Sequence, residues 1–315
     1  MASHTPTETL PSSTSLTKPQ RRRRSGLARE EMRDAYLMIG IWLIGFLIFT
    51  AGPIVASMWL SLTTWDLIDD AKWTGLDNYR AMLKDDLIWT SLWNTLYYTL
   101  ILVPLSTIGA LGLALAMNLK LHGMRFYRTV YYLPSITPVV ATTLLWLMIF
   151  QPEFGVANYV LQKFGIPKQL WLLSPEQAKA VLILIALWGI GGGMPIFLAG
   201  LQAIPREFYE AAAIDGSNHW NSFLYVTLPL LTPVIFFSVI TGIIGSFQVF
   251  ASAYVATAGG PENATLFYVL LLYRNAFEYF KMGYASSMAW VLFIIVLIFT
   301  IFQFRLARRW VHYEV

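Results

Sequence analysis

The sequence of 315 residues contains no cysteine. The chain therefore cannot form a disulfide, bind an Fe–S cluster through thiolates or use a thiol in catalysis. Histidine is also scarce, and all four copies (His4, His122, His219 and His312) lie outside the long apolar stretches. Haem and metal sites inside a membrane usually need histidine at helix depth, so this placement argues against either.

Catalytic motifs are missing as well. The sequence has no G-x-x-x-x-G-K-[ST] loop, so any ATP hydrolysis must come from another chain. No pair of carboxylates and no Ser/His/Asp set lies where a common face would bring its members together. The glycine run "GIGGG" at 189–193 lies within a charge-free apolar stretch, which favours close helix packing over a phosphate site. We therefore expect that this chain is not an enzyme.

Charged side chains make up only 13% of the chain, against about 25% in ordinary soluble domains. Hydrophobic residues make up 57%, and the mean hydropathy is +0.56. A membrane protein is the class that fits this composition. A helix needs about 20 apolar residues to cross the hydrocarbon core. Six runs without a charged side chain meet that length: 35–65, 87–119, 129–152, 180–205, 216–261 and 282–304.

The predicted fold is all-α: a polytopic membrane protein with six transmembrane helices and a cytoplasmic helix–turn–helix loop. We expect the spans at about 36–62, 92–118, 130–151, 180–202, 230–255 and 283–304. Residues 1–34 are predicted to be a disordered basic cytoplasmic tail, and 35–315 a single transmembrane domain in contact with membrane lipid. The apolar segment 266–273 is too short to cross, so it is expected to lie at the interface or to re-enter the membrane.

The distribution of Lys and Arg predicts the orientation. With both termini on one side, that side holds fourteen of the 22 Lys and Arg residues, including the "RRRR" run at 21–24. The positive-inside rule then places both termini in the cytoplasm. A basic tail could instead bind nucleic acid, but beside a membrane entry it more often sets topology. No nucleic-acid partner is therefore expected.

The loop 203–229 is predicted to form a helix, a tight turn and a second helix on the cytoplasmic side. Pro205 suits the first turn of a helix because its missing N–H is not needed there. Gly216 follows an aspartate and readily takes the left-handed conformation that ends a helix. Ser217 or Asn218 can cap the next helix. Two roles remain open on physical grounds: docking of a small-residue surface into a partner's groove, or an amphipathic loop lying on the bilayer.

Several segments together resemble a known family. They are "EAAAIDG" at 210–216, "SFQVFASAYVATAGGP" at 246–261, the stretch beginning "GYASSMAW" at 283–314, "WTGLDNYRAML" at 73–83 and "FYRTVYYLPSITP" at 126–138. The pattern is similar to that of ATP-binding-cassette importer permeases, and in particular to the first-permease type of the carbohydrate-uptake branch. The likeness covers nearly everything after the basic tail.

The resemblance implies a permease subunit of an ATP-driven, binding-protein-dependent importer that carries a sugar or oligosaccharide across a bacterial inner membrane. The implied partners are a second homologous permease, two ATPase subunits that hold ATP and magnesium, and an extracytoplasmic solute-binding protein. No cofactor is expected in this chain. In that family the loop couples the ATPases to transport. The residues matching the coupling motif are Glu210, Ala211, Asp215 and Gly216, with Arg206 as their neighbour and Ser217 where family members often have alanine.

The candidate pathway residues are polar or aromatic residues inside the spans. Two of them lie between prolines, at an expected helix irregularity where freed backbone groups can line a cavity. The alternative for each residue is packing or hydrogen bonding between helices. The candidates are Ser135, Thr137, Trp188, Gly189, Ser246, Gln248, Phe250 and Tyr254.

Two other functions compete with sugar import. The same type of transporter could carry glycerol-3-phosphate or another polyol, but a dianionic solute would favour Arg or Lys facing the cavity, and the spans contain neither. A non-transporting membrane scaffold subunit would need no polar lining at all.

Overall fold

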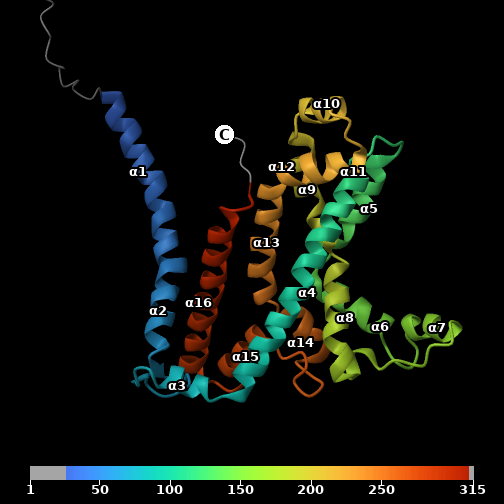
Figure 1. The fold of residues 1–315 in the computed structure, drawn as a ribbon. Coiled ribbons are helices and arrows are strands. Elements are labelled where there is room, and N and C mark those ends of the chain that lie inside the picture. The colour runs from blue at the N-terminus through green and yellow to red at the C-terminus, as the bar shows by residue number, and fades with distance from the viewer. Residues whose placement is uncertain (1–25, 312–315) are drawn as a thin grey trace, which may run out of the picture. The chain divides into compact units, whose positions relative to one another are not determined.

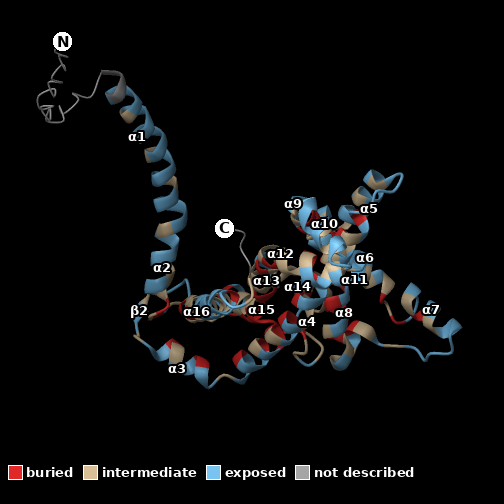
Figure 2. Ribbon diagram, turned by 45° about the horizontal axis from the view of Figure 1, so that its top comes forward, coloured by how far each residue is buried: buried red, intermediate tan, exposed pale blue. Residues whose placement is uncertain are grey.

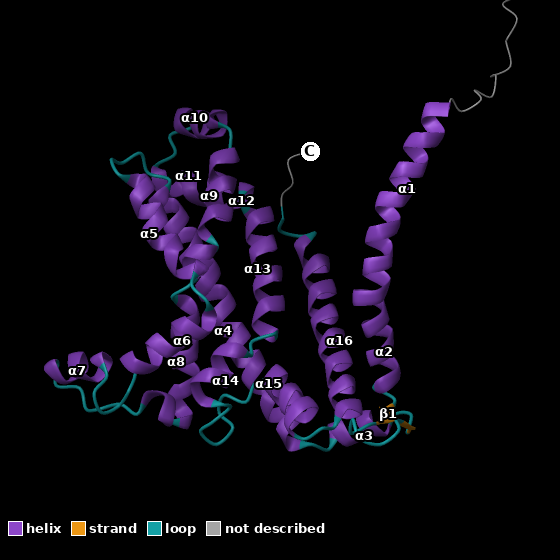
Figure 3. Cartoon of the chain, turned by 180° about the vertical axis from the view of Figure 1, so that it is seen from behind, coloured by secondary structure: helices purple, strands orange, loops and turns teal. Residues whose placement is uncertain are grey.

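The computed structural model describes residues 26–311, with side chains from residue 29 onward. Helices make up about three quarters of the described chain, and strands β1 (Thr63–Thr64) and β2 (Lys72–Trp73) pair with each other in antiparallel register (Figure 3). The chain divides into two units, Met1–Val55 and Ala56–Val315.

The first unit contains helix α1 (Gly26–Phe46), a π-helical turn η1 (Leu47–Ala51) and the beginning of α2 (Gly52–Leu60). The predicted tail is therefore helical from Gly26 onward, and the rest of it lies outside the described residues. The wider π turn directly precedes Pro53, whose ring would clash with the preceding turn of a regular helix. The stretch Arg29–Leu60 is long and apolar enough to span a membrane.

Two further helices are uninterrupted spans: α4 (Asp86–Met117) and α16 (Met282–Ala307). The remaining spans are bent pairs, so the described residues give six spans when each pair is counted as one. The prediction of a six-span, all-α membrane fold is confirmed in this form. The third, fourth and fifth spans are each interrupted.

The third span consists of α5 (Met124–Ile136) and α6 (Val139–Ile149), which meet at 95°. Thr137 between them is extended, with ψ of 133°. The ring of Pro138 disfavours the helical conformation in the residue before it, so the helix must stop there. The expected irregularity between the two prolines is present, but it turns the chain by a right angle.

The fourth span consists of α8 (Pro175–Leu187), a 3₁₀ turn η3 (Ile190–Gly192) and α9 (Met194–Ala203), with a bend of 41°. At this bend Gly191 lies directly against the backbone of α5. A Cβ atom there would lie 1.8 Å from the carbonyl oxygen of Tyr131 on α5. The glycine run therefore lets two backbones cross, which is the packing role predicted from the sequence.

The fifth span is not the single helix predicted at 230–255. Its bent pair is His219–Leu230 with α13 (Thr232–Phe247), which meet at 62°. Helix α13 ends before Gln248, and a separate helix α14 (Ala251–Thr257) follows residues 248–250. No proline, glycine or charged residue stands at 248–250. The break follows from tertiary packing, because the ring of Phe250 lies 4.9 Å from that of Tyr273, a residue distant in the sequence.

Helix α4 runs through the centre of the second unit and contacts α8, α9 and α13. Buried residues gather along it (Figure 2). One cluster joins α4 to α8, α15 and α16, and a second joins its other half to α9 and the start of α13. The segment around α15 (Tyr268–Tyr273) is too short to cross, as predicted, and its Tyr268, Leu270 and Leu271 are buried inside the protein.

The loops contain the remaining elements. Asn78 fixes the segment before α4, because its Nδ2 donates to the carbonyl oxygens of Ser61 (2.9 Å) and Thr63 (2.8 Å). The other short helices are α3 (Asp77–Leu83), α7 (Val156–Lys163), η2 (Trp171–Leu173), α10 (Arg206–Ile214), α11 (His219–Ser222), η4 (Phe223–Thr227), α12 (Leu228–Leu230) and η5 (Arg274–Glu278). Within the second unit, α10 and α11 lie at one end, and α6, α14 and α15 lie toward the other (Figure 1).

Candidate functional site

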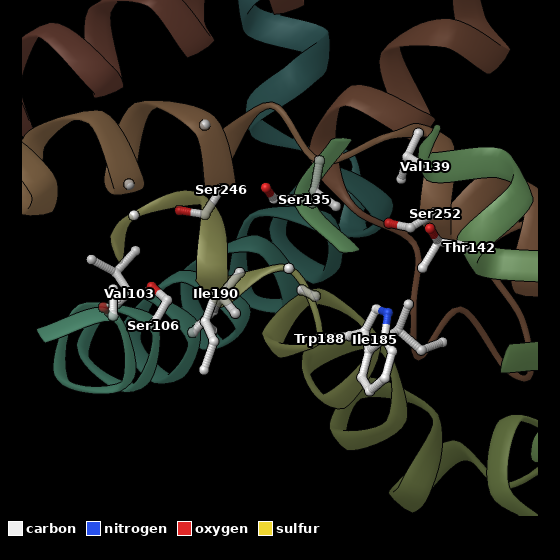
Figure 4. A pocket seen from close by; sticks show the side chains of 18 of the residues that line it. Val103, Ser106, Ser135, Val139, Thr142, Ile185, Trp188, Ile190, Ser246 and Ser252 are labelled. Atoms are coloured by element: carbon white, nitrogen blue, oxygen red, sulfur yellow. Dashed lines mark hydrogen bonds between the residues drawn. The ribbon is translucent and has the colours of Figure 1, made fainter. Parts of the chain in front are cut away.

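A central cavity of about 680 Å³ lies among α4, the α5–α6 break, the α8–η3–α9 bend and the α13–α14 break. The α5–α6 break, the α8–η3–α9 bend and the α13–α14 break therefore open onto the same space. Figure 4 shows hydroxyl-bearing side chains distributed around it. The polar lining residues are Ser106, Ser135, Thr137, Thr142, Ser238, Thr241, Ser246, Gln248 and Ser252, and the aromatic ones are Tyr98, Trp188 and Phe250.

Seven of the eight predicted pathway residues line this cavity, and Tyr254 does not. The α5–α6 break contributes Ser135 and Thr137 through the mechanism expected. The hydroxyl of Ser135 donates to the carbonyl oxygen of Tyr132 at 2.7 Å, one turn back along α5. The remaining lone pairs of such a hydroxyl can still accept a hydrogen bond from a solute.

Ser246 and Gln248 differ in their availability. Ser246 is buried, and its hydroxyl oxygen lies within hydrogen-bond distance of Thr99 Oγ1 on α4 (2.9 Å) and of the carbonyl oxygen of Ile243 (3.0 Å). This is the interhelical hydrogen bond given as the alternative role for each candidate. Gln248 is exposed at the C-terminal end of α13. Its amide carries both donors and an acceptor, as recognition of a hydroxyl-rich solute requires.

The central cavity is electrically neutral. Among the described residues that line it, none carries an acidic, basic or imidazole side chain. In the same part of the chain, no group of three or more His, Cys, Asp or Glu is placed to hold a metal ion. The chemistry that this cavity offers is hydrogen bonding to neutral groups and stacking on ring faces.

Sequence reasoning missed several of the hydroxyl residues. Ser106, Thr142 and Ser252 line the cavity from α4, α6 and α14. Small polar residues occur on all faces of these helices, so the sequence alone does not show which ones turn inward. A neighbouring proline is the available signal for Ser106, which lies two residues after Pro104 inside α4.

The predicted helix–turn–helix loop forms with the expected chemistry. Helix α10 ends in a Schellman motif, in which the N–H of Gly216 donates to the carbonyl of Ala213 at 3.1 Å and the N–H of Ser217 donates to that of Ala212 at 2.9 Å. Gly216 has a φ of +79°, the left-handed conformation predicted for it. Asn218 then caps α11, since its Oδ1 accepts from the N–H of Asn221 at 2.8 Å.

The loop exposes the residues predicted to couple it to the ATPases. The predicted coupling residues Arg206, Glu210, Ala211, Asp215 and Gly216 are all exposed. Ile214 is 88% exposed, which is unusual for a large apolar side chain next to a polar turn.

Two residues that sequence reasoning missed join helix α10 to the segment η4. The hydroxyl of Tyr209 lies 3.0 Å from the hydroxyl of Thr227, which is buried in η4. Helix α10 is therefore attached to the helix that follows it.

Comparisons with known proteins agree with this architecture. The family described as "Binding-protein-dependent transport system inner membrane component" matches residues 108–312. The probable ABC transporter permease YesP of Bacillus subtilis is 43% identical over 297 residues, covering 93% of this chain and 96% of that protein. The arabinooligosaccharide permease AraP of Bacillus subtilis is 33% identical, covering 86% of this chain and 88% of that protein. The sn-glycerol-3-phosphate permease UgpA of Agrobacterium fabrum is 34% identical, covering 88% and 96%.

A solved structure shares the fold. It is a chain of a bacterial alginate ABC transporter in complex with an alginate pentasaccharide-bound periplasmic protein, with a TM-score of 0.80 and 21% identity, covering 93% of this chain and all of that one. The chain belongs to the binding-protein-dependent transport system inner-membrane components, as a multi-pass permease subunit.

Proposed function

We propose that this chain is one of two homologous permeases of an ATP-driven importer and that a neutral sugar or oligosaccharide passes through its central cavity. Two ATPase subunits bind ATP and magnesium, and an extracytoplasmic binding protein delivers the solute. The distribution of Lys and Arg supports a cytoplasmic position for α10 and for both termini. The observation that carries the proposal is the neutral lining of hydroxyl, amide and aromatic groups.

The chemistry of the lining favours a neutral sugar over a phosphorylated polyol. Relatives of similar identity are named for arabinooligosaccharides and for glycerol-3-phosphate, so sequence identity does not decide between them. A dianion deprived of water needs cationic or multiple charge-assisted partners, and this lining supplies none. A sugar needs hydroxyl partners and apolar faces, such as the rings of Trp188 and Phe250.

The position of the loop supports a coupling role. The chain enters α10 directly from α9, whose N-terminal half lines the central cavity through Gly193 and Ile196. It leaves the turn through α11, η4 and α12 into α13, which lines the cavity through Thr241 and Gly245. The turn is therefore joined to two walls of the cavity through short helical segments, one of which meets α13 at a bend of 62°.

Helices α9 and α13, which precede and follow the loop, move together because they share a core. Phe197 and Leu201 of α9 are buried in one cluster with Leu231 at the start of α13. The hydrogen bond between Tyr209 and Thr227 closes the loop on its other side. Closure of the ATPase pair on ATP binding pulls on the exposed turn. The packed ends of α9 and α13 transmit this movement to the cavity.

The test is transport by the assembled complex. Both permeases, the ATPases and the binding protein are reconstituted in liposomes, and uptake of labelled maltose, lactose, raffinose and arabinotriose is compared with uptake of labelled sn-glycerol-3-phosphate. ATP-dependent uptake of at least one neutral sugar, with no uptake of the phosphate ester, is expected. Uptake of the ester alone contradicts the neutral-solute proposal, and ATPase activity that no solute stimulates indicates a scaffold.

A further inference from the structure

A second cavity of about 590 Å³ adjoins the central one. Helices α6 and α14 line both spaces, the first residues of each helix facing the central cavity and the last facing the second. The second cavity is neutral too, since its described lining residues include no charged side chain. Its polar groups include the side chains of Gln151, Tyr254 and Thr257.

Two rows of aromatic rings connect the cavities. On one wall Trp188 lines the central cavity and lies 5.5 Å from Trp146, which stacks at 5.3 Å on Phe150, a lining residue of the second cavity. On the other wall Phe250 lines the central cavity and stacks at 5.4 Å, with an angle of 19° between ring planes, on Tyr254 of the second. Tyr254, the one predicted pathway residue outside the central cavity, therefore belongs to an adjoining space.

The wall behind the second cavity is held rigidly. Asn94 Nδ2 donates to the carbonyl oxygens of Asn263 (2.8 Å) and Leu266 (3.1 Å), which fixes the loop after α14 to α4. The buried hydroxyl of Thr265 donates to the carbonyl oxygen of Gly260, a lining residue, at 2.7 Å. A wall that is ordered beforehand lowers the entropy cost of binding.

We infer that the second cavity is an additional sugar subsite, so that the pathway holds an oligosaccharide across both cavities. The inference rests on the proposed import of neutral sugars. Each cavity falls within the range of about 300–1,000 Å³ typical of small-molecule sites. A monosaccharide or disaccharide fills one space, whereas a longer chain extends from Trp188 and Phe250 in the central cavity to Tyr254 in the second and contacts both. Tyr254 is the residue that selects for length.

The first test is a change at Tyr254. Tyr254→Leu keeps apolar bulk and removes the ring face and the hydroxyl. Uptake of maltose, maltotriose and maltopentaose is measured, or of the arabinose oligomers of the same lengths if only that series is carried. The expected loss, relative to wild type, is about three- to tenfold greater for the five-unit sugar than for the two-unit sugar. Tyr279→Leu is the matched control, since Tyr279 is an exposed tyrosine that lines neither cavity.

The second test uses the absence of cysteine from this chain. Leu173→Cys places a single thiol in the lining of the second cavity, and its reaction with a charged methanethiosulfonate reagent is followed on the band of this subunit. The five-unit sugar should slow labelling at least threefold more than the two-unit sugar does.

An equal loss at all lengths in Tyr254→Leu, or labelling that the long sugar does not slow, overturns the subsite while leaving sugar import intact. A wild-type complex that takes up no neutral sugar of any length instead refutes the proposed function, and the subsite with it.

Discussion

The turn at Gly216 allows the coupling role of the loop to be tested with one backbone change. Gly216 holds the left-handed conformation, and a Cβ atom placed there would meet no other atom within 4 Å. A substitution therefore leaves packing intact and acts through the backbone alone. Gly216→Val is the test variant because a β-branched residue is disfavoured in this conformation, whereas Gly216→Asn is the matched control because asparagine tolerates it.

The expected magnitude follows from the conformational penalty. A non-glycine residue in the left-handed region costs about 1–2 kcal/mol, which corresponds to a factor of about 5–30 in an equilibrium. If the formed corner is the state that engages the ATPases, its population falls by that factor in Gly216→Val. Solute uptake should fall to the same degree, and the uptake per ATP hydrolysed should fall with it.

The assay compares three complexes in liposomes at equal amounts of assembled protein: wild type, Gly216→Val and Gly216→Asn. The asparagine variant should retain at least half of wild-type uptake. Wild-type coupling in a correctly assembled Gly216→Val complex would refute the reasoning. Equal losses in both variants would show that side-chain bulk, and not backbone conformation, is what the partner senses.

Three other changes probe the scaffold around the cavity. Gly191→Ala places a methyl group against the α5 backbone and should destabilise the protein by about 1–3 kcal/mol or more. A thermal-unfolding assay in detergent should show a lower midpoint for this variant, whereas the control Gly112→Ala, in open space within α4, should leave the midpoint unchanged or higher. Tyr209→Phe removes the hydrogen bond to Thr227 and should weaken the attachment of α10 by about 0.5–1.5 kcal/mol; unchanged hydrogen exchange of the α10 amides would contradict this. Asn94→Ala leaves two carbonyls of the loop after α14 without their donor and should cost about 2–4 kcal/mol; proteolysis of that loop at the wild-type rate would show that it is held otherwise.

Local chemistry predicted the features that a few adjacent residues determine. The break before Pro138 follows from the ring of one proline, and the turn at Gly216 follows from an Asp-Gly step at a helix end. The break at 248–250 has no such signal, because the ring that Phe250 packs against comes from Tyr273, after an intervening loop. Sequence patterns located this segment within a span but could not show that the helix is interrupted there.

The cavity was predictable in its chemistry and only partly in its membership. Polar residues near helix interruptions, such as Ser135, pointed to the lining because a broken helix exposes backbone groups. Ser106 lies in an unbroken helix, and its inward orientation depends on how α4 packs against three other helices. Ser246 shows the converse, since its hydroxyl is used between helices.

The most direct test of the account is whether a transported sugar occupies the central cavity. Ser106→Cys introduces a single thiol in its lining, and Ile68→Cys places one in the loop between β1 and β2, at a residue that is 88% exposed and outside the lining. In the reconstituted complex, a neutral sugar that stimulates ATP hydrolysis should slow methanethiosulfonate labelling at position 106 and leave labelling at position 68 unaffected. Unchanged labelling at position 106 during active uptake would contradict the account, because the sugar would then be crossing by another route.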